Sequence, residues 1–266
     1  MRQGQRKVVL IMSNILDSFR LDNKIALVTG SAGGMGAAIS IALAQAGATV
    51  ATHDVRPPTE TAGAIVAAGG KSAAFSADLS DTAAPEALFK QVLAKFGRVD
   101  ILVNNAGIIL REDAVNVPLA DWLKVIQINE TAVFQLSQLA GRDMIARNAP
   151  GKIISTASLL SFQGGIRVPS YAAAKGAVAQ ITKALANEWA VKNIQVNAIA
   201  PGYIATNNTA PLRADPVRSK AILDRIPAGR WGETTDVTGA AVFLASAASD
   251  YITGHVLVVD GGWMAR

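Results

Sequence analysis

Cysteine is absent from this chain of 266 residues, and histidine occurs only as His53 and His255. Without cysteine, the chain forms no disulfide bond and no thiolate metal site. Neither histidine has a second ligand at the spacing that metal sites use. We therefore predict no bound metal and assign both histidines a structural role.

Long apolar runs are absent as well, since no stretch approaches the roughly 18 residues that a membrane-spanning helix needs. The head of the chain has a basic start and an apolar run of five residues, Val8 to Met12. A secretory leader would need about 7–15 apolar residues and a small-residue cleavage site. We expect a cytoplasmic protein without membrane contact. We also expect residues 1–20 to form a flexible N-terminal extension. Alternatively, translation starts at Met12.

Charged residues make up only 17% of the chain and aromatic residues 5%, whereas half of the residues are apolar. This composition is typical of a globular protein. The net charge is +5, of which Arg2, Arg6 and Lys7 supply +3, so the rest of the chain carries only +2. Such a small excess does not indicate a nucleic-acid-binding surface. The four scattered tryptophans are better explained by packing or an interface than by base stacking.

Apolar, β-branched segments alternate with helical segments from Lys24 onward. The expected strands cover residues 24–30, 48–54, 71–79, 99–105, 151–158, 193–200 and 255–262. The expected helices cover residues 37–47, 57–68, 85–96, 120–147, 171–191 and a polar stretch at 206–226, followed by one more helix that ends at 247. Strands that are apolar on both faces are typical of a parallel sheet covered on both sides. The sequence therefore predicts one α/β domain over residues 21–266, Rossmann-like and doubly wound, with a mostly parallel seven-stranded sheet and helices on both faces.

A glycine-rich turn follows the first expected strand and begins the first helix. Gly30, Gly34 and Gly36 give the pattern TGxxxGxG rather than the commoner GxGxxG. Glycines let the backbone approach a pyrophosphate, and the following helix N-terminus offers free N–H donors. In this context the turn predicts a dinucleotide site. The remaining residues expected to contribute to it are Ser31, Gly33 and Met35.

Asp54 ends the second expected strand, where an acid is placed to accept hydrogen bonds from the adenosine ribose of a dinucleotide. Its charge would also repel the 2′-phosphate of NADP. Arg56 could instead accommodate that phosphate, and Asp54 could be a plain turn residue before Pro57 and Pro58. We expect NAD as the cofactor, with NADP as the alternative.

Tyr171 and Lys175 are four residues apart, so both side chains can lie on one face of a helix and enter one cleft. A phenol has a pKa of about 10, and a nearby cation favours its ionised form. The pair can therefore act as a general acid/base near neutral pH. Ser158, at the end of the preceding strand, could bind a substrate carbonyl or hydroxyl. Taken alone, this spacing also fits a plain surface helix.

Further motifs follow in a fixed order along the chain: Asp78-Leu79, Asn104-Asn105-Ala106-Gly107, Asn129, Pro201-Gly202 and Asp260-Gly261-Gly262. With the residues above, they resemble the short-chain dehydrogenase/reductase family over essentially the whole chain from Leu21. The ordered set is far more specific than any single motif. Taken singly, Asn104-Asn105 could be a turn and Asn129 a polar residue in the middle of a helix.

The resemblance implies a role for each matched residue. Tyr171 would be the general acid/base, and Ser158 would orient the reacting oxygen. Lys175 would bind the nicotinamide ribose and shift the tyrosine. Asn129 would complete the catalytic set by holding a water that connects Lys175 to solvent. Besides the glycine-rich turn and Asp54, the implied cofactor contacts are Asp78, Leu79, Asn105, Ala106, Gly107, Tyr171, Lys175, Pro201, Gly202, Ile204 and Thr206.

Several segments also resemble one group within the family, the 2-dehydro-3-deoxy-D-gluconate 5-dehydrogenases, also named 2-deoxy-D-gluconate 3-dehydrogenases. These segments include SFQGGIRVPSY, NAIAPGYIATNNT, ILDRIPAGRWG and the terminal DGGWMAR. The group implies the interconversion of 3-deoxy-2,5-diketo-hexonate and 2-keto-3-deoxygluconate, in hexuronate and pectin breakdown. Binding of an acidic sugar requires a cation near the cleft, and Arg167 and Arg111 are the candidates. Each of them could equally be a structural or solvent-exposed arginine. The other predicted substrate residues are Ser158, Gln163 and Tyr203.

Two other functions stay open at this point. The first is reduction of a different ketone, such as a 3-oxoacyl thioester or a polyol, on the same fold. The second is nucleotide binding without catalysis, which damage at Ser158, Tyr171 or Lys175 would indicate. All three residues are present in this chain.

The resemblance further implies a homotetramer. The last expected strand would lie at the sheet edge, where a bare apolar strand invites contact with another chain. The helices at 120–147 and 171–191 are apolar beyond one stripe. We expect the tail from Trp263 to Arg266 to extend toward a neighbouring subunit. There, Arg266 or the terminal carboxylate would lie near the substrate cleft of that subunit.

Overall fold

The computed structural model describes residues 14–266, and its centre is a sheet of seven parallel strands. The strands are β1 (Ile25–Thr29), β2 (Thr49–Asp54), β3 (Lys71–Ser76), β4 (Ile101–Asn104), β5 (Gly151–Thr156), β6 (Ile194–Pro201) and β7 (Val256–Val259). Their order across the sheet is β3-β2-β1-β4-β5-β6-β7. The chain adds β2 and β3 on one side of β1 and then β4 to β7 on its other side, so the strand order reverses between β1 and β4. Ligands of open α/β sheets bind beyond the carboxyl ends of the strands at such a point.

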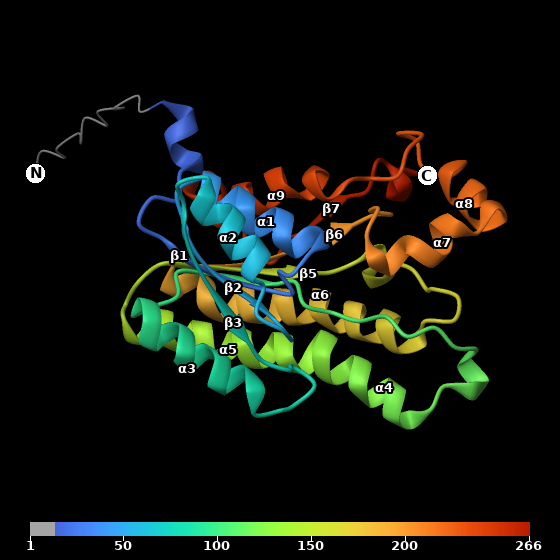
Figure 1. Ribbon diagram of the computed structural model, residues 1–266, viewed down its shortest axis with the longest axis horizontal. Coiled ribbons are helices and arrows are strands. Elements are labelled where there is room, and N and C mark those ends of the chain that lie inside the picture. The colour runs from blue at the N-terminus through green and yellow to red at the C-terminus, as the bar shows by residue number, and fades with distance from the viewer. Residues whose placement is uncertain (1–13) are drawn as a thin grey trace, which may run out of the picture.

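Helices cover both faces of the sheet, and Figure 1 shows the two layers. The first layer contains α1 (Gly34–Gln45), α2 (Thr59–Ala67) and α9 (Thr238–Ala245). The second contains α3 (Ala84–Phe96), α4 (Leu119–Ile126), α5 (Ala132–Ala146) and α6 (Pro169–Trp189). Two short helices, α7 (Ala210–Ala214) and α8 (Pro216–Leu223), lie at one end of the molecule, beside the C-terminus. The predicted fold class is confirmed, and all seven strands are parallel.

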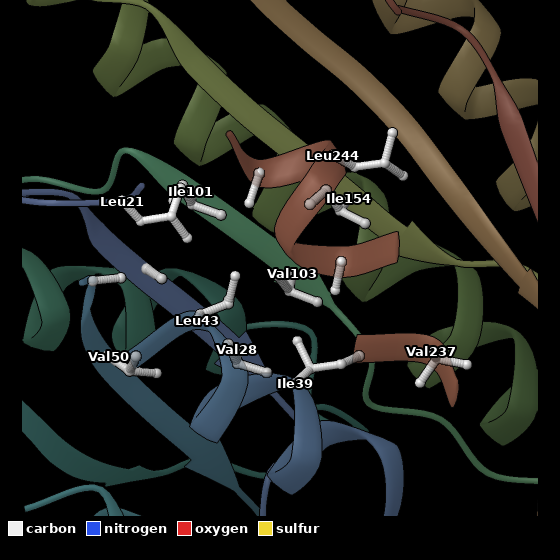
Figure 2. Packing of buried hydrophobic residues seen from close by; sticks show 14 of the residues in the cluster. Leu21, Val28, Ile39, Leu43, Val50, Ile101, Val103, Ile154, Val237 and Leu244 are labelled. Carbon is white, nitrogen blue, oxygen red and sulfur yellow. The ribbon is translucent and has the colours of Figure 1, made fainter. Parts of the chain in front are cut away.

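Each layer of helices encloses its own apolar core. Under α1 and α9, Val28, Val50 and Ile101 of the strands meet Leu43 and Leu244 of the helices, as Figure 2 shows. A second core on the opposite face of the sheet contains, among others, Leu27, Leu102, Leu136, Met144 and Ile153. Successive residues of a strand point to opposite faces. The doubly apolar strands of the sequence therefore supply both cores.

The stretch predicted as one helix over residues 120–147 differs from the expectation. It contains α4 and α5, joined by a π-helical turn at Gln127–Thr131. A π turn inserts one extra residue into the helical ladder and is found mostly at functional sites. Here it contains Asn129, which is fully buried.

The first residues that the structure describes already contact the domain. Ile15–Phe19 form a short 3₁₀ helix, and the ring of Phe19 lies 6.2 Å from that of Phe243 in α9. The predicted extension over residues 1–20 therefore includes a segment that touches the first layer of helices. Residues 1–13 lie outside the described part of the chain.

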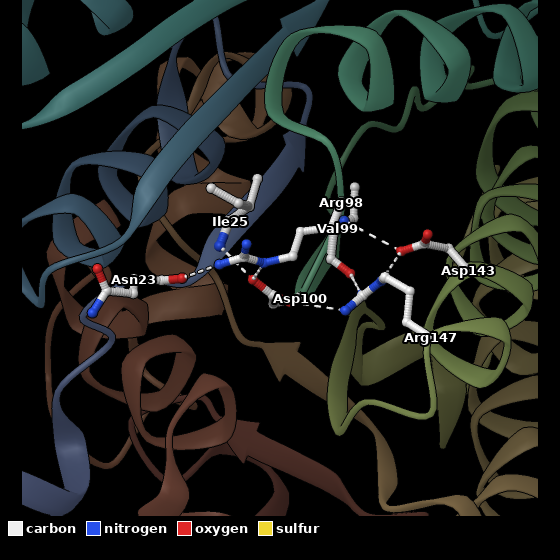
Figure 3. A network of polar contacts seen from close by, with 7 residues as sticks. All are labelled: Asn23, Ile25, Arg98, Val99, Asp100, Asp143 and Arg147. Carbon is white, nitrogen blue, oxygen red and sulfur yellow. Dashed lines mark hydrogen bonds and ion pairs between the residues drawn. The ribbon is translucent and has the colours of Figure 1, made fainter.

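A polar network fastens the sheet at the amino ends of β1 and β4, as Figure 3 shows. The carboxylate of Asp100 accepts hydrogen bonds from the Ile25 amide and from Arg98, both at 2.9 Å. Arg147 of α5 approaches the other oxygen of Asp100 at 3.5 Å and pairs with Asp143 at 3.0 Å. One nearly buried carboxylate thus joins two strands to a helix of the second layer.

None of the helices between residues 14 and 266 combines the length and apolar character of a membrane span.

Candidate active site

The glycine-rich turn leaves no room for a side chain at Gly30 or Gly36. Gly30 has φ of +68°, and a Cβ there would lie 2.7 Å from the Cα of Ala106. A Cβ on Gly36 would lie 2.0 Å from the carbonyl oxygen of Gly30. The turn and the loop after β4 are therefore packed backbone to backbone, and α1 begins with its amides open to the cleft. This arrangement is the anion site expected at a helix N-terminus.

Thr29 and Asn105 hold these two loops together. The Thr29 hydroxyl accepts hydrogen bonds from the amides of Asn105 and Ala106, each at 3.0 Å. The Asn105 amide group in turn donates to the carbonyls of Thr29 and Gly30, also at 3.0 Å. The asparagine of the predicted motif is thus a brace between β1 and β4 as well as part of the cleft wall.

The cleft beside this turn has a volume of about 690 Å³. It is lined by most of the predicted cofactor residues: Gly30, Gly33, Gly34, Met35, Gly36, Asp54, Asp78, Leu79, Asn105, Ala106, Gly107 and Thr206. Ser31 is fully buried beneath it, where its hydroxyl donates to the carbonyl of His53 at 3.1 Å. Ser31 therefore supports the turn from behind rather than lining the cleft.

Asp54 lies at the cleft wall at the end of β2. One carboxylate oxygen accepts from the amide of Ala32 at 3.0 Å and the other from the amide of Val55 at 2.8 Å. These bonds hold the carboxylate in place and leave lone pairs for a ribose hydroxyl. Arg56 is exposed and is absent from the cleft lining.

His53 also lines this cleft, which the sequence analysis did not predict. Its Nε2 lies 3.1 Å from the carbonyl oxygen of Ala77, so Nε2 carries the proton and Nδ1 is an acceptor. Nδ1 is buried and has no partner among the described residues. Burial lowers the pKa of His53, so the ring is neutral at physiological pH. An unpaired acceptor in the wall agrees with a cleft built for a polar ligand.

Ser158 and Tyr171 meet at a second pocket, and Lys175 lies beside Tyr171 behind its wall. Ser158 caps the 3₁₀ turn after β5, where its oxygen accepts from the amide of Leu160 at 3.2 Å, and it also hydrogen-bonds Tyr171. Tyr171 lies in the first turn of α6, and Lys175 follows one turn later. The Lys175 ammonium lies 5.5 Å from the centre of the Tyr171 ring and donates to the carbonyl of Thr156. The structure therefore brings the predicted catalytic serine, tyrosine and lysine together.

The pKa of Tyr171 is shifted in the direction opposite to the one expected. Burial raises the pKa of this phenol, and the hydrogen bond from Ser158 and the charge of Arg111 only partly offset the effect. Lys175 is itself 3% exposed, and burial lowers its pKa to about 8. The lysine bonds to a backbone carbonyl and lies over the ring rather than beside the hydroxyl. Desolvation therefore outweighs the cation in this environment.

Asn129 lies on the π turn, and its side chain serves the loop after β4. Its carbonyl accepts from the amide of Ile108 at 2.9 Å, and its amide group donates to the carbonyl of Ile108 at 2.8 Å. Ile108 lines the cofactor cleft, so Asn129 fixes part of that wall. The predicted water-holding role of Asn129 stays a prediction.

The second pocket has a volume of about 430 Å³. Its walls contain most of the predicted substrate residues together with three of the predicted cofactor contacts: Ser158, Gln163, Tyr171, Tyr203, Arg111, Pro201 and Gly202. Ile204 lines a separate hollow of about 250 Å³, and Lys175 lies beneath Tyr171 in none of these cavities.

Arg167 does not line the substrate pocket. Its guanidinium pairs with Asp113 at 3.0 Å and approaches Glu112 at 4.0 Å, and its carbonyl accepts from the Glu112 amide at 3.0 Å. The residue also adopts φ of +64°. Arg167 therefore fastens the loop after β5 to the loop after β4. Since two carboxylates already hold its charge outside the pocket wall, this structure does not support its predicted role as a substrate-binding cation, which stays a prediction.

Among the charged and aromatic residues of the pocket wall, the sequence did not predict three: Arg218 of α8, Arg225 just after it, and Trp263 of the C-terminal tail. Two arginines in a polar segment look like ordinary surface residues in a sequence. A tryptophan near the end of the sequence carries no positional signal either. The position of α8 brings the two arginines to the pocket, and the return of the chain after β7 brings Trp263.

The C-terminal tail folds onto its own subunit, which differs from the expectation. The Trp263 indole donates to Gln163 at 3.2 Å, and Arg266 donates to the carbonyls of Asp224 and Arg225 at 2.6 and 3.2 Å. The tail therefore completes the substrate pocket of its own chain. The described residues, 14–266, contain no group of three metal-ligating side chains.

A profile of known sequences, described as enoyl-(acyl carrier protein) reductase, matches residues 30–264, which include the glycine-rich turn, the catalytic residues and the tail. The chain belongs to the short-chain dehydrogenase/reductase family. A family member described as a short-chain type dehydrogenase/reductase from Mycobacterium marinum has 35% identity and a TM-score of 0.89 over 94% of this chain and 99% of its own.

More similar family members carry names from sugar-acid metabolism. The chain is 54% identical to the 2-dehydro-3-deoxy-D-gluconate 5-dehydrogenase of Dickeya dadantii and 52% identical to that of Escherichia coli, each over 95% of this chain and 100% of the relative. A candidate 2-deoxy-D-gluconate 3-dehydrogenase from Agrobacterium tumefaciens, solved with bound NADP, is 53% identical over 94% of this chain and 99% of its own, with a TM-score of 0.87. A gluconate 5-dehydrogenase from Burkholderia cenocepacia, solved with NADP and tartrate, is 39% identical over 94% and 99%, with a TM-score of 0.89.

Proposed function

We propose that this dehydrogenase/reductase interconverts a ketone and a secondary alcohol on an acidic deoxy-sugar, with NAD(P) as cofactor. The observation that carries the proposal is the composition of the substrate pocket. Ser158 and Tyr171 lie on its wall together with three arginines, whereas no aspartate or glutamate is present there. Such a pocket suits a small anion that carries a carbonyl group.

The residues of the chain divide the chemistry between them. A bound nicotinamide cofactor supplies or accepts the hydride. Tyr171 stays protonated at neutral pH because burial raises its pKa, so its hydroxyl is a proton donor to a carbonyl oxygen during reduction. Ser158, hydrogen-bonded to Tyr171, holds the same oxygen. In the oxidation direction, the phenolate form of Tyr171 takes up the proton of the alcohol, so this direction first requires Tyr171 to lose its own proton and is favoured at alkaline pH.

The proposed reaction is 3-deoxy-2,5-diketo-hexonate plus NAD(P)H and a proton, giving 2-keto-3-deoxygluconate and NAD(P)⁺. Relatives with 51–54% identity carry the name of this activity. A polyol lacks the charge that the three arginines match. A nucleotide-binding role without catalysis would leave the contact of Ser158, Tyr171 and Lys175 unexplained.

Asp54 supports NAD as the preferred cofactor, because its fixed carboxylate faces the ribose position of the cleft. The relative from Agrobacterium tumefaciens holds NADP, so this preference needs its own measurement.

The test follows the absorbance of NADH and NADPH at 340 nm while the purified protein meets a panel of ketones. The panel contains keto-acid sugars, a 3-oxoacyl thioester and an uncharged ketose. Turnover of the keto-acid sugars alone supports the proposal. Equal or better turnover of the thioester or the ketose overturns it.

We further propose a place in hexuronate and pectin breakdown, in the cytoplasm, and a homotetrameric assembly. Several apolar residues of the two long helical stretches do not argue for a partner, because they are buried inside this chain: Val133, Leu136, Val178 and Leu185. What supports assembly is the exposed apolar set on α4 and α5, namely Leu119, Leu123 and Phe134. Light scattering tests it, and a fully active monomer would contradict it.

A further inference from the structure

The arginines of the substrate pocket lie in two different places. Arg111 lowers the pKa of Tyr171, so it lies near the reacting hydroxyl. Arg218 and Arg225 instead lie near Tyr203, which follows Gly202 in the pocket wall: burial raises the pKa of Tyr203, and the charges of the two arginines partly offset this rise. The pocket therefore has a reactive end, with Ser158 and Tyr171, and a second cationic end formed by α8 and the residues after it.

Arg225 is held in one orientation by the tail. Its guanidinium carbon lies 4.0 Å from the ring centre of Trp263, which is the geometry of a cation–π contact. Trp263 is 6% exposed, and its ring also packs against Tyr203 at 4.7 Å between ring centres. Arg266 ties the tail to the carbonyl of Arg225 itself. An arginine fixed in this way loses little freedom when it binds a ligand.

The charges of Arg218 and Arg225 have no acidic partner. Neither residue takes part in an ion pair of 4.0 Å or less within residues 14–266. Eight other arginines and lysines of the same region do form such pairs: Arg20, Lys90, Arg98, Arg147, Lys152, Arg167, Lys220 and Arg230. No acid lines the pocket that they face. Two unpaired guanidinium groups on one wall are the arrangement that binds a carboxylate through paired N–H donors.

We propose that Arg225, together with Arg218, binds the carboxylate of the substrate, and that Trp263 positions Arg225 for it. The inference rests on the proposed function, since it names how that acidic substrate is held. In the proposed substrate, the reacting C5 and the carboxylate carbon are four carbon–carbon bonds apart, roughly 5 Å at about 1.5 Å per bond. The carboxylate therefore lies away from the reacting carbon, which favours the arginines of the α8 end over Arg111, whose charge acts on Tyr171.

The first experiment compares 2-keto-3-deoxygluconate with its uncharged methyl ester in the oxidation direction. We expect Arg225→Gln to raise KM for the acid at least tenfold, the size of effect that a lost hydrogen bond to a charged group produces. The kcat for the acid and the KM for the ester should change by less than about twofold. Arg142→Gln removes the same charge from an exposed site on α5 and should change neither KM.

Arg225→Lys controls for packing and charge. It retains the cation but loses the forked donors, so its KM for the acid should lie between those of the unmodified protein and Arg225→Gln. A KM for the acid that moves less than threefold in Arg225→Gln overturns the proposal. So does an equal rise for acid and ester, because that result indicates a damaged pocket rather than a lost charge contact.

The positioning role of Trp263 has a separate readout. Trp263→Leu should raise KM for the acid but not for the ester, whereas Trp263→Phe, which retains an aromatic face, should restore most of the affinity. In the double variant with Arg225→Gln, the loss should equal that of Arg225→Gln alone, because both changes act through one contact. Additive losses would overturn this role.

Calorimetric titration with tartrate, in the presence of NADPH, separates this inference from the proposed function. If the unmodified protein turns over no sugar acid, the proposed reaction fails. Tartrate binding that weakens at least tenfold in Arg225→Gln, but not in Arg142→Gln, would still support the carboxylate site. Equal tartrate affinity in all three proteins, or no binding to any of them, overturns it.

Discussion

Tyr171 is the side chain on which the proposed chemistry depends most directly. Its hydroxyl contacts Ser158 in the pocket wall, and its ring rests above the Lys175 ammonium. The hydroxyl can therefore be removed with little loss of packing, since a phenylalanine fills the same space. This separates the role of Tyr171 in chemistry from its role in structure.

Tyr171→Phe should reduce turnover by about 10²–10⁴-fold, the usual contribution of a general acid/base. The melting temperature and the affinity for NADH should stay close to those of the unmodified protein. Steady-state rates and cofactor titration by fluorescence provide the measurements. If the variant turned over substrate as fast as the unmodified protein, Tyr171 would not be the general acid/base.

Lys175 links stability to pH. Burial disfavours its charged form, so its pKa falls to about 8 from the ordinary 10.5. As pH rises from 8 toward 10.5, the folded protein releases this proton while the unfolded chain still holds it. Stability contributed by this residue therefore rises with pH across that window.

Lys175→Met removes this dependence. Between pH 7.5 and 9.5, the unmodified protein should gain about 2 kcal/mol of unfolding free energy relative to the variant, at 1.36 kcal/mol per pKa unit. Urea unfolding at the two pH values measures the difference. Lys183→Met, at an exposed position of the same helix, should show no such gain. A parallel pH response of Lys175→Met and the unmodified protein would contradict the buried charge.

Asp54→Ala should shift the cofactor preference toward NADP. The change removes a ribose acceptor and a charge that repels the 2′-phosphate, and a charged hydrogen bond is worth about 1.5–3 kcal/mol. The measurement is the ratio of kcat/KM for NADH and NADPH in both proteins. If the unmodified protein already favours NADPH, Asp54 does not select the cofactor and the role passes to Arg56.

Among the secondary-structure elements, the π turn between α4 and α5 connects the helix layer to the cofactor cleft. Asn129 satisfies both the amide and the carbonyl of Ile108, and a regular helix would place this side chain differently. The turn is thus the means by which a residue of the second layer holds the loop after β4.

Asn129→Ala should cost about 2 kcal/mol of unfolding free energy or more, because it leaves two backbone groups of Ile108 without partners. It should also weaken cofactor binding, since Ile108 lines that cleft. Thr131→Ala, in the same turn, provides the control. Urea unfolding and NADH titration measure both effects, and equal behaviour of the two variants would contradict the role of Asn129.

The sequence predicted the elements that carry a local pattern. The glycine-rich turn, the seven strands and the spacing of Tyr171 and Lys175 all follow from rules that act within about ten residues. The π turn was missed because apolar spacing over residues 120–147 does not show one inserted residue. The partners of Arg167 and Arg225 were missed because they come from segments far away in the chain. Charge pairing between loops leaves no periodic signal in the sequence. An arginine that pairs with acids of its own chain and an arginine that faces a substrate pocket therefore cannot be told apart from the sequence.

At the level of the whole domain, stability and function occupy opposite ends of the sheet. The network around Asp100 lies at the amino ends of β1 and β4, whereas the cofactor cleft lies beyond their carboxyl ends. Changes in the network should therefore alter folding without altering the site.

Asp100→Ala should lower the unfolding free energy by about 3 kcal/mol or more, because it breaks a nearly buried charge network. Asp100→Asn retains an acceptor for the Ile25 amide and should cost less. KM values for cofactor and substrate should stay unchanged in both variants. A loss of affinity as large as the loss of stability would show that the two ends are coupled.

The position of Trp263 has a consequence for how the protein is made. The cofactor cleft is lined by residues up to Thr234, but the substrate pocket also needs Trp263, which is synthesised later than all of them. Chains are synthesised at about 5–20 residues per second, and their N-terminal parts fold first. During synthesis on the ribosome, the residues that form the cofactor cleft should therefore be available to fold before the substrate pocket is complete. A chain that ended just before Trp263 would bind the cofactor but would bind the acid poorly. Such a product would keep part of the cell's nicotinamide nucleotide bound while catalysing little reaction.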